Sequence, residues 1–161
     1  MAPTEDWRIE AAGLALALEM GRASLSEAVS WADALIVRQD EPDDRLIELS
    51  LARTLNDAIG HLNAVARDVG LDDRVMAFLD RLLPLERIEP GDADDLAFRL
   101  ARLYDGEGAD SKIGTCLHHH DDALHMAIEG AYGSLDACAR RLLDDVDALL
   151  AEWRAGVMDG R

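Results

Sequence analysis

Residues 134–153, SLDACARRLLDDVDALLAEW, contain the pattern that decides the fold. Apolar side chains recur in this stretch at spacings of three and four residues, which places them on one face of an α-helix. The residues on this face are Leu135, Cys138, Leu142, Val146, Leu149 and Trp153. Ser134 precedes them and suits the N-cap. The pattern predicts a long amphipathic helix that closes a bundle, and the same face is where we would expect two copies to meet in a homo-oligomer.

The same helical spacing extends along the rest of the chain, and no stretch alternates between apolar and polar residues for long enough to indicate a strand. The length of 161 residues is typical of one compact domain. We therefore predict an all-α fold in which residues 1–161 form a single domain, a bundle of about seven to eight amphipathic helices. A short α-solenoid of helical hairpins is the alternative.

Capping residues, glycines and prolines predict where the helices begin and end. The expected helical ranges are 4–21, 24 or 26 to 38, 42–52, 54–69, 72–83, 92 or 94 to 105, 121–130 and 134–153. The ranges 42–52 and 54–69 could also form one continuous helix. Residues 11–18 are apolar on every side, so the first helix is expected in the centre of the core. Two glycines within residues 105–111 predict a flexible loop around 105–113.

The acidic charge is large and evenly spread. Of the formal net charge of −17, residues 1–80 carry −9 and residues 81–161 carry −8. No basic region is present that could neutralise nucleic-acid phosphates, and an anionic membrane surface would repel the molecule. We therefore expect no nucleic acid and no membrane among the partners. A protein with a basic surface is the expected partner, because opposite charges accelerate association.

Several features of the composition indicate a cytoplasmic protein of bacterial type. The longest apolar run, Ala11 to Leu18, has eight residues, far fewer than the roughly 20 that span a bilayer. The first residues contain no basic leader before an apolar run, so no signal peptide is expected. Cys116 and Cys138 fit a reducing compartment. Lys112 is the chain's only lysine, and together with abundant alanine, leucine and aspartate this is typical of a GC-rich bacterial genome.

A histidine-rich segment, CLHHHDDALH at residues 116–125, holds four of the chain's five histidines. If the segment is helical, imidazole and carboxylate groups spaced by three and four residues share one face, where neighbours can bind a common metal ion. The fifth histidine follows an aspartate by four residues and offers a second such pair. The candidate metal ligands are His118, Asp122, His125, Asp57 and His61. These donor types suit zinc, manganese or iron.

The other interpretation of the same segment needs no metal. His118, His119 and His120 would be solvated residues ahead of a helix, and Asp121 and Asp122 would lie in its first turn, where the helix dipole favours negative charge. A third use of clustered histidines is a pH switch. The sequence contains no phosphate-binding loop, nucleophile elbow or dinucleotide fingerprint, so no catalytic residue and no organic cofactor are predicted.

Two classes of function remain. The first is a small acidic interaction protein that neutralises or regulates a basic protein partner, in the way that acidic helical immunity proteins and antitoxins do. The basis of that analogy is size, charge and fold class alone. The second class is a metal-binding helical bundle, or a metal-dependent hydrolase, that uses the cluster from His118 to His125. We expect the first class and no enzymatic activity.

Overall fold

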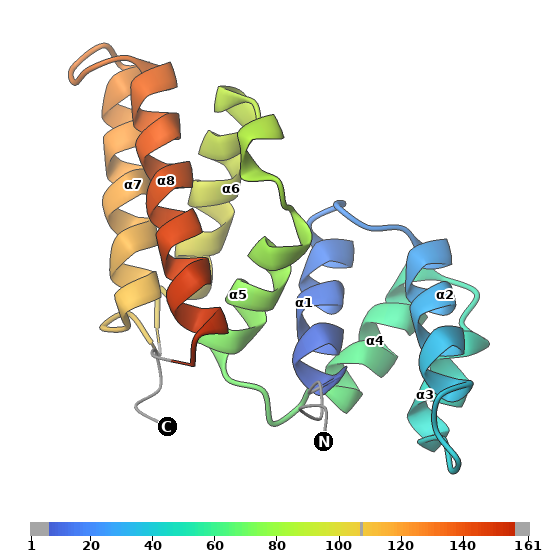
Figure 1. Ribbon diagram of the computed structural model, residues 1–161. Helices are drawn as coiled ribbons and strands as arrows, with labels where there is room; N and C mark the ends of the chain where they lie inside the picture. Colours follow the sequence, from blue (N-terminus) through green and yellow to red (C-terminus); the bar gives the residue numbers. More distant parts are fainter. Residues whose placement is uncertain (1–6, 107, 157–161) are drawn as a thin grey trace. The chain divides into compact units, whose positions relative to one another are not determined.

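The computed structural model describes residues 7–106 and 108–156, and within these residues all regular structure is helical (Figure 1). The α-helices are α1 (Trp7–Glu19), α2 (Leu25–Ile36), α3 (Asp44–Ser50), α4 (Leu55–Val65), α5 (Leu71–Arg81), α6 (Pro90–Leu103), α7 (Lys112–Ile128) and α8 (Leu135–Arg154). A short 3-10 helix, η1 (Leu85–Arg87), lies between α5 and α6. The all-α prediction is confirmed.

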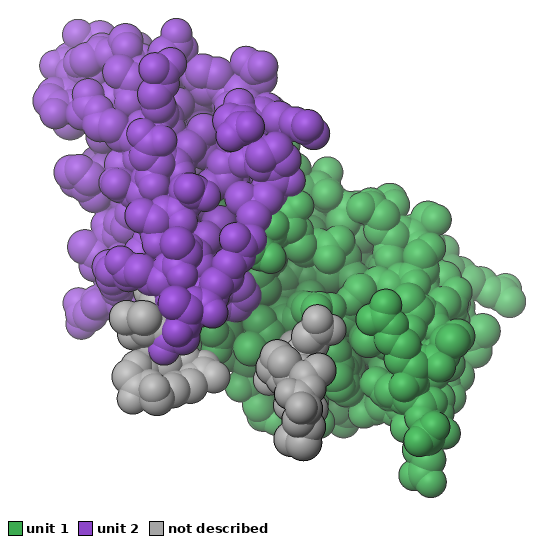
Figure 2. Space-filling view, viewed as in Figure 1, with its two compact units in different colours: residues 1–81 green, residues 82–161 purple. Residues whose placement is uncertain are grey.

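The contacts among the helices divide the chain into two compact units, residues 1–81 and residues 82–161 (Figure 2). Unit 1 contains α1 to α5, and unit 2 contains η1 and α6 to α8. Each unit is described below by itself. The expected single domain over residues 1–161 stays a prediction.

Helix α1 forms the centre of unit 1. Every residue from Ala11 to Leu18 is buried, because α1 packs against α4 and α5 and its apolar side chains extend to all sides. Gly13 lies where α1 meets α5. Helices α2, α3 and α4 add Ala28, Leu49 and Leu62 to the same core. The prediction that the first helix is central is therefore confirmed for the described residues.

Polar side chains connect α1 to its neighbours at the edge of this core. The Trp31 indole Nε1 on α2 donates a hydrogen bond of 3.0 Å to the Glu10 carboxylate. Asn63 on α4 donates to Glu19 over 3.2 Å and accepts a 2.7 Å hydrogen bond from Arg74 on α5. These contacts join the two ends of α1 to α2 and α4, and join α4 in turn to α5.

Three of the predicted caps are present. The side-chain oxygens of Ser24, Thr54 and Ser134 each accept a hydrogen bond from the backbone N–H three residues later, at the starts of α2, α4 and α8. Such caps satisfy backbone donors that have no partner within the helix. The cap expected at Thr4 lies outside the described residues. The extended backbone at Thr54 separates α3 from α4, so the alternative of one continuous helix is wrong.

Several predicted boundaries are wrong, among them the end of the fourth helix, which was expected at residue 69 and lies at Val65. Helix α6 begins at Pro90 and not at residue 92 or 94, because proline suits the first helical position. Helix α7 begins at Lys112 and not after His120, so the histidines lie inside a helix rather than ahead of one. The loop expected around 105–113 therefore ends at Ser111, two residues earlier than expected. Glu107 lies outside the described residues, and the flexibility of the loop stays a prediction.

Unit 2 is built from α6, α7 and α8, each of which packs against the other two. The apolar face of α8 supplies Cys138, Leu142, Val146 and Leu149 to the core of this unit. This burial agrees with the prediction that α8 closes a bundle. Homo-oligomer formation through residues 135–153 stays a prediction. Among the described residues, no helix is both long enough and apolar enough to cross a membrane.

The start of α2 yields a prediction about pH dependence. Glu27 accepts hydrogen bonds of 2.7 Å and 2.9 Å from the backbone N–H and the hydroxyl of Ser24, completing a capping box. The backbone hydrogen bond is the largest cause of a lowered Glu27 pKa, the Ser24 hydroxyl is the next, and burial opposes both. A carboxyl group whose pKa is lower in the folded state stabilises that state above its ordinary pKa, and this contribution is lost as the pH falls through the lowered value.

Glu27→Gln is the matched variant, because glutamine keeps the shape of the side chain and removes its charge. We expect the variant to be less stable than the wild type at pH 7 by about 0.3–1 kcal/mol, as for other charges in a first helical turn. The difference should shrink and disappear as the pH falls below 4.5, the ordinary pKa of Glu27. Urea unfolding at several pH values measures it. A difference that does not change with pH would contradict this account.

Candidate functional site

Three donor side chains meet between α7 and α8 in unit 2. Cys116 and His120 are one helical turn apart on α7 and therefore share a face, and Asp145 lies on α8. The imidazole Nε2 of His120 is 2.7 Å from the Asp145 carboxylate. One donor atom from each of the three residues lies within 4.8 Å of the other two. Within residues 7–106 and 108–156, no other group of three Cys, His, Asp or Glu donors is gathered in this way. We call this group the Cys-His-Asp trio.

The surroundings of the trio change from buried to exposed. His120 is 4% exposed and is the only buried polar or charged side chain among the described residues. Cys116 is half-buried and Asp145 is exposed. A buried imidazole needs a hydrogen-bond partner, and Asp145 provides one. The trio therefore has a buried end at His120 and a solvent-facing end at Asp145.

The start of α7 positions the trio against α8. The Ser111 hydroxyl accepts a 2.9 Å hydrogen bond from the backbone N–H of Gly114 and so caps α7. In the first turn, Lys112 forms an ion pair with Glu152 on α8. Gly114 lies against the buried ring of Tyr104. These contacts fix where α7 begins relative to α8, and with it the position of Cys116.

The electrostatics of the trio do not match those of an activated nucleophile. The pKa of the Cys116 thiol is raised to about 11, mainly by burial and then by the nearby Asp145 carboxylate, while Lys112 opposes the shift. A nucleophilic cysteine needs a lowered pKa so that the thiolate is populated near neutral pH. The trio instead brings sulfur, nitrogen and oxygen donors within 4.8 Å of one another, a spacing that suits a cation, which would itself deprotonate the thiol on binding.

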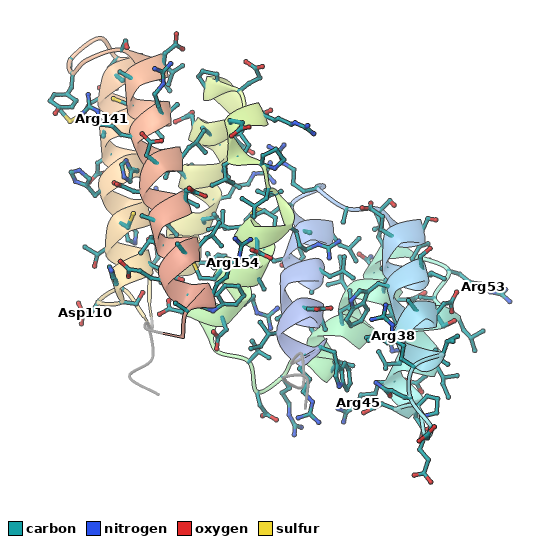
Figure 3. The ribbon with its side chains drawn as sticks, viewed as in Figure 1. Arg38, Arg45, Arg53, Asp110, Arg141 and Arg154 are labelled. Atoms are coloured by element: carbon teal, nitrogen blue, oxygen red, sulfur yellow. The ribbon has the colours of Figure 1, made fainter. Side chains whose placement is uncertain are left out.

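A small pocket of about 220 Å³ reaches His120 from the surface of unit 2. Its lining includes His119, Asp122, Tyr132 and Arg141. Figure 3 shows Arg141 at the end of unit 2 where the turn joins α7 to α8. His120 therefore contacts the Asp145 carboxylate and also borders a pocket.

The residues predicted as metal ligands occupy separate places. Helix α7 does contain His118, Asp122 and His125, as the sequence interpretation required. However, the His118 Nε2 lies 3.7 Å from Asp105, and the His125 Nε2 lies 3.3 Å from Glu129. Neither histidine belongs to the Cys-His-Asp trio, and nor does Asp122, which is exposed.

The second predicted pair is in unit 1. Asp57 and His61 lie one turn apart on α4, and the His61 Nδ1 is 3.4 Å from the Glu48 carboxylate on α3. Among the described residues, no third donor lies near these two within the distance that defines the trio. The metal site expected from the sequence stays a prediction, and the trio is a different set.

A larger hollow, which we call the acidic groove, lies between residues 83–90 and α8 in unit 2. It has a volume of about 750 Å³. Its apolar residues include the half-buried Leu83, Ile88 and Leu143. Five exposed carboxylates border it, namely Glu86, Glu89, Asp136, Asp144 and Asp147. Arg140 is the only basic residue in the lining.

The carboxylates of the acidic groove differ from several others on the surface. Asp95, Asp105 and Glu152 each form an ion pair with an arginine or with Lys112. None of the five groove carboxylates has a hydrogen-bond or ion-pair partner in the described part of the chain, and Arg140 has none either. The groove therefore combines half-buried apolar side chains, which we call its apolar floor, with exposed carboxylates that no described side chain pairs.

Comparisons with protein-family models, with curated proteins and with solved structures found no match to this chain.

Proposed function

We propose that the protein is an interaction protein that binds a basic protein partner, and that the acidic groove receives an amphipathic, lysine- or arginine-rich segment of that partner. The observation that carries the proposal is the set of five unpaired carboxylates around an apolar floor. Carboxylates without partners inside the protein can pair with cations from outside, and the floor can bury the apolar side of the same segment.

The net charge of the whole chain favours a basic partner over a second copy of the protein as the occupant of the acidic groove. A second copy of the protein would add another −17 and would bring carboxylates against carboxylates. The uniform negative field instead attracts a basic partner over distances of about one Debye length, roughly 8–10 Å near physiological salt. The groove then supplies the short-range contacts. Neutralisation or regulation of that partner is the role we propose.

A synthetic amphipathic helix of alternating leucine and lysine clusters can serve as the probe, with a peptide that carries glutamate in place of lysine as the control. Three exposed ion pairs of about 0.2–1 kcal/mol each correspond to an affinity change of roughly three- to a hundredfold. We expect the triple variant Glu86→Gln, Asp144→Asn, Asp147→Asn to lose affinity for the leucine–lysine peptide by a factor in this range. Fluorescence anisotropy with labelled peptide measures the affinity.

The matched control removes the same charge elsewhere through Asp40→Asn, Glu41→Gln and Asp110→Asn, none of which lines the groove. This control should change the affinity by less than threefold at moderate salt. The association rate of the wild type should fall steeply as NaCl is added, because salt screens the steering field. Equal losses in both triple variants would show that the peptide binds the general surface and would overturn the assignment to the groove. An association rate that does not change with salt would contradict the proposed electrostatic steering of the partner.

A further inference from the structure

We propose that Cys116, His120 and Asp145 form a site for one zinc ion, with three protein ligands from α7 and α8 and an open fourth position. This site is independent of the acidic groove, and it differs from the ligand set that the sequence predicts. Asp145 belongs neither to the apolar face of α8 nor to the histidine-rich segment of α7. Only the packing of these two helices brings it to Cys116 and His120.

The distances between the donor atoms fit the size of a zinc site. Zinc binds sulfur at about 2.3 Å and nitrogen or oxygen at about 2.0–2.2 Å, so tetrahedral donors lie roughly 3.3–3.7 Å apart. The trio places its donors within 4.8 Å of one another, and its shortest contact, between His120 and Asp145, is 2.7 Å. Coordination would lengthen that contact by less than about 1 Å and would shorten a separation of 4.8 Å by roughly 1.1–1.5 Å. Small movements of the side chains suffice.

The chemistry of the donors selects the metal. A cysteine thiolate is a soft ligand that magnesium, calcium and manganese do not favour, whereas zinc accepts sulfur, imidazole nitrogen and carboxylate oxygen together. Three protein ligands with a fourth position left for water are typical of zinc sites that are accessible to solvent. The exposed carboxylate of Asp145 provides that access, and the buried imidazole of His120 provides a rigid anchor.

The competing explanation is that Asp145 only satisfies the buried imidazole of His120. That explanation needs no thiol. Cys116, half-buried one turn before His120, is therefore the residue that separates the two accounts. Its replacement should abolish tight zinc binding if the trio is a metal site, and should leave any adventitious zinc binding unchanged if it is not.

The experiment uses the full chain, freed of metal with a chelator and titrated with Zn²⁺ by calorimetry and with Co²⁺ by absorption spectroscopy. We expect one zinc ion per chain and, with cobalt, a near-ultraviolet charge-transfer band from the thiolate. Cys116→Ser should remove the band, and Cys116→Ser and Asp145→Asn should each weaken zinc binding by about a hundredfold, the upper end of losses known for second-shell partners. Circular dichroism confirms that both variants fold.

Two controls make the result specific. Cys138→Ala replaces the chain's other cysteine, which is buried in the core of unit 2, and should keep both the stoichiometry and the charge-transfer band. The double variant Asp122→Asn, His125→Ala removes two of the five ligands predicted from the sequence and should also keep the stoichiometry and the band. The proposal is overturned if the wild type binds no zinc, if Cys116→Ser binds as tightly as the wild type, or if the double variant alone loses the metal.

Discussion

Gly13→Ala is expected to destabilise unit 1 by about 3 kcal/mol, at the upper end of the effects of overpacking a core. A Cβ atom at position 13 would lie 2.7 Å from the carbonyl carbon of Ala77 and 2.8 Å from the backbone nitrogen of Phe78. These are backbone atoms of α5, so no side-chain rotation can relieve the contact. Helices α1 and α5 would have to move apart, which would open the best-packed part of the unit.

The matched control is Gly60→Ala. Gly60 also lies inside a helix of unit 1, but an added Cβ there would meet no atom within 4 Å. Alanine should stabilise this site by about 0.5–1 kcal/mol, because glycine is the poorer helix former. Unfolding in urea, followed by circular dichroism, compares the two variants. If both glycines can be replaced without loss of stability, the close approach of α1 and α5 is not as described.

Gly114→Ala is expected to destabilise unit 2 by about 2 kcal/mol. An added Cβ would lie 2.7 Å from the Cδ1 atom of Tyr104 and 2.9 Å from the Gly108 carbonyl oxygen. The Tyr104 ring is fully buried in a close-packed interior, so the ring or the start of α7 would have to shift. Gly91→Ala in α6 is the matched control, because its added Cβ would meet open space. In urea, Gly114→Ala should unfold at a lower midpoint concentration than Gly91→Ala.

The same variant connects the fold to the zinc proposal. Cys116 follows Gly114 by two residues, so a shift at the start of α7 moves the thiol relative to Asp145 on α8. We expect Gly114→Ala to weaken zinc binding by at least tenfold, since outer positioning groups have effects of about this size. A variant with reduced stability and unchanged zinc affinity would show that Cys116 keeps its position without the packing of Gly114.

Much of the fold could be predicted because local signals agreed with tertiary packing. In α1, α2, α4 and α8, the apolar spacing and the capping hydroxyls indicate the helices that form. For α7 they conflict: glycine at position 114 and three successive histidines are poor helix formers, so the segment looked like a loop. Packing decides otherwise, since Ile113, Leu117 and Leu124 are buried at helical spacing and Gly114 is needed for a close approach to Tyr104.

The candidate site was less predictable than the fold. Two donors of the trio, Cys116 and His120, belong to the histidine-rich segment, but neither was among the predicted ligands. Their shared face becomes evident only when α7 is known to begin at Lys112. Asp145 is one of several aspartates on α8. Its neighbours Leu142 and Val146 show which face is buried, yet the spacing alone does not say which flanking carboxylate meets α7.

The close packing of α1 against α5 also has a consequence for the order of events during synthesis. Helix α1 leaves the ribosome first among the helices of unit 1, and the partner that covers Gly13 leaves last. Until α5 has emerged, part of the apolar surface from Ala11 to Leu18 has nothing to cover it. Such nascent surfaces invite aggregation and chaperone binding. Unit 1 can therefore close only when its whole length has been translated, because its most extensive helix–helix contact joins its first helix to its last.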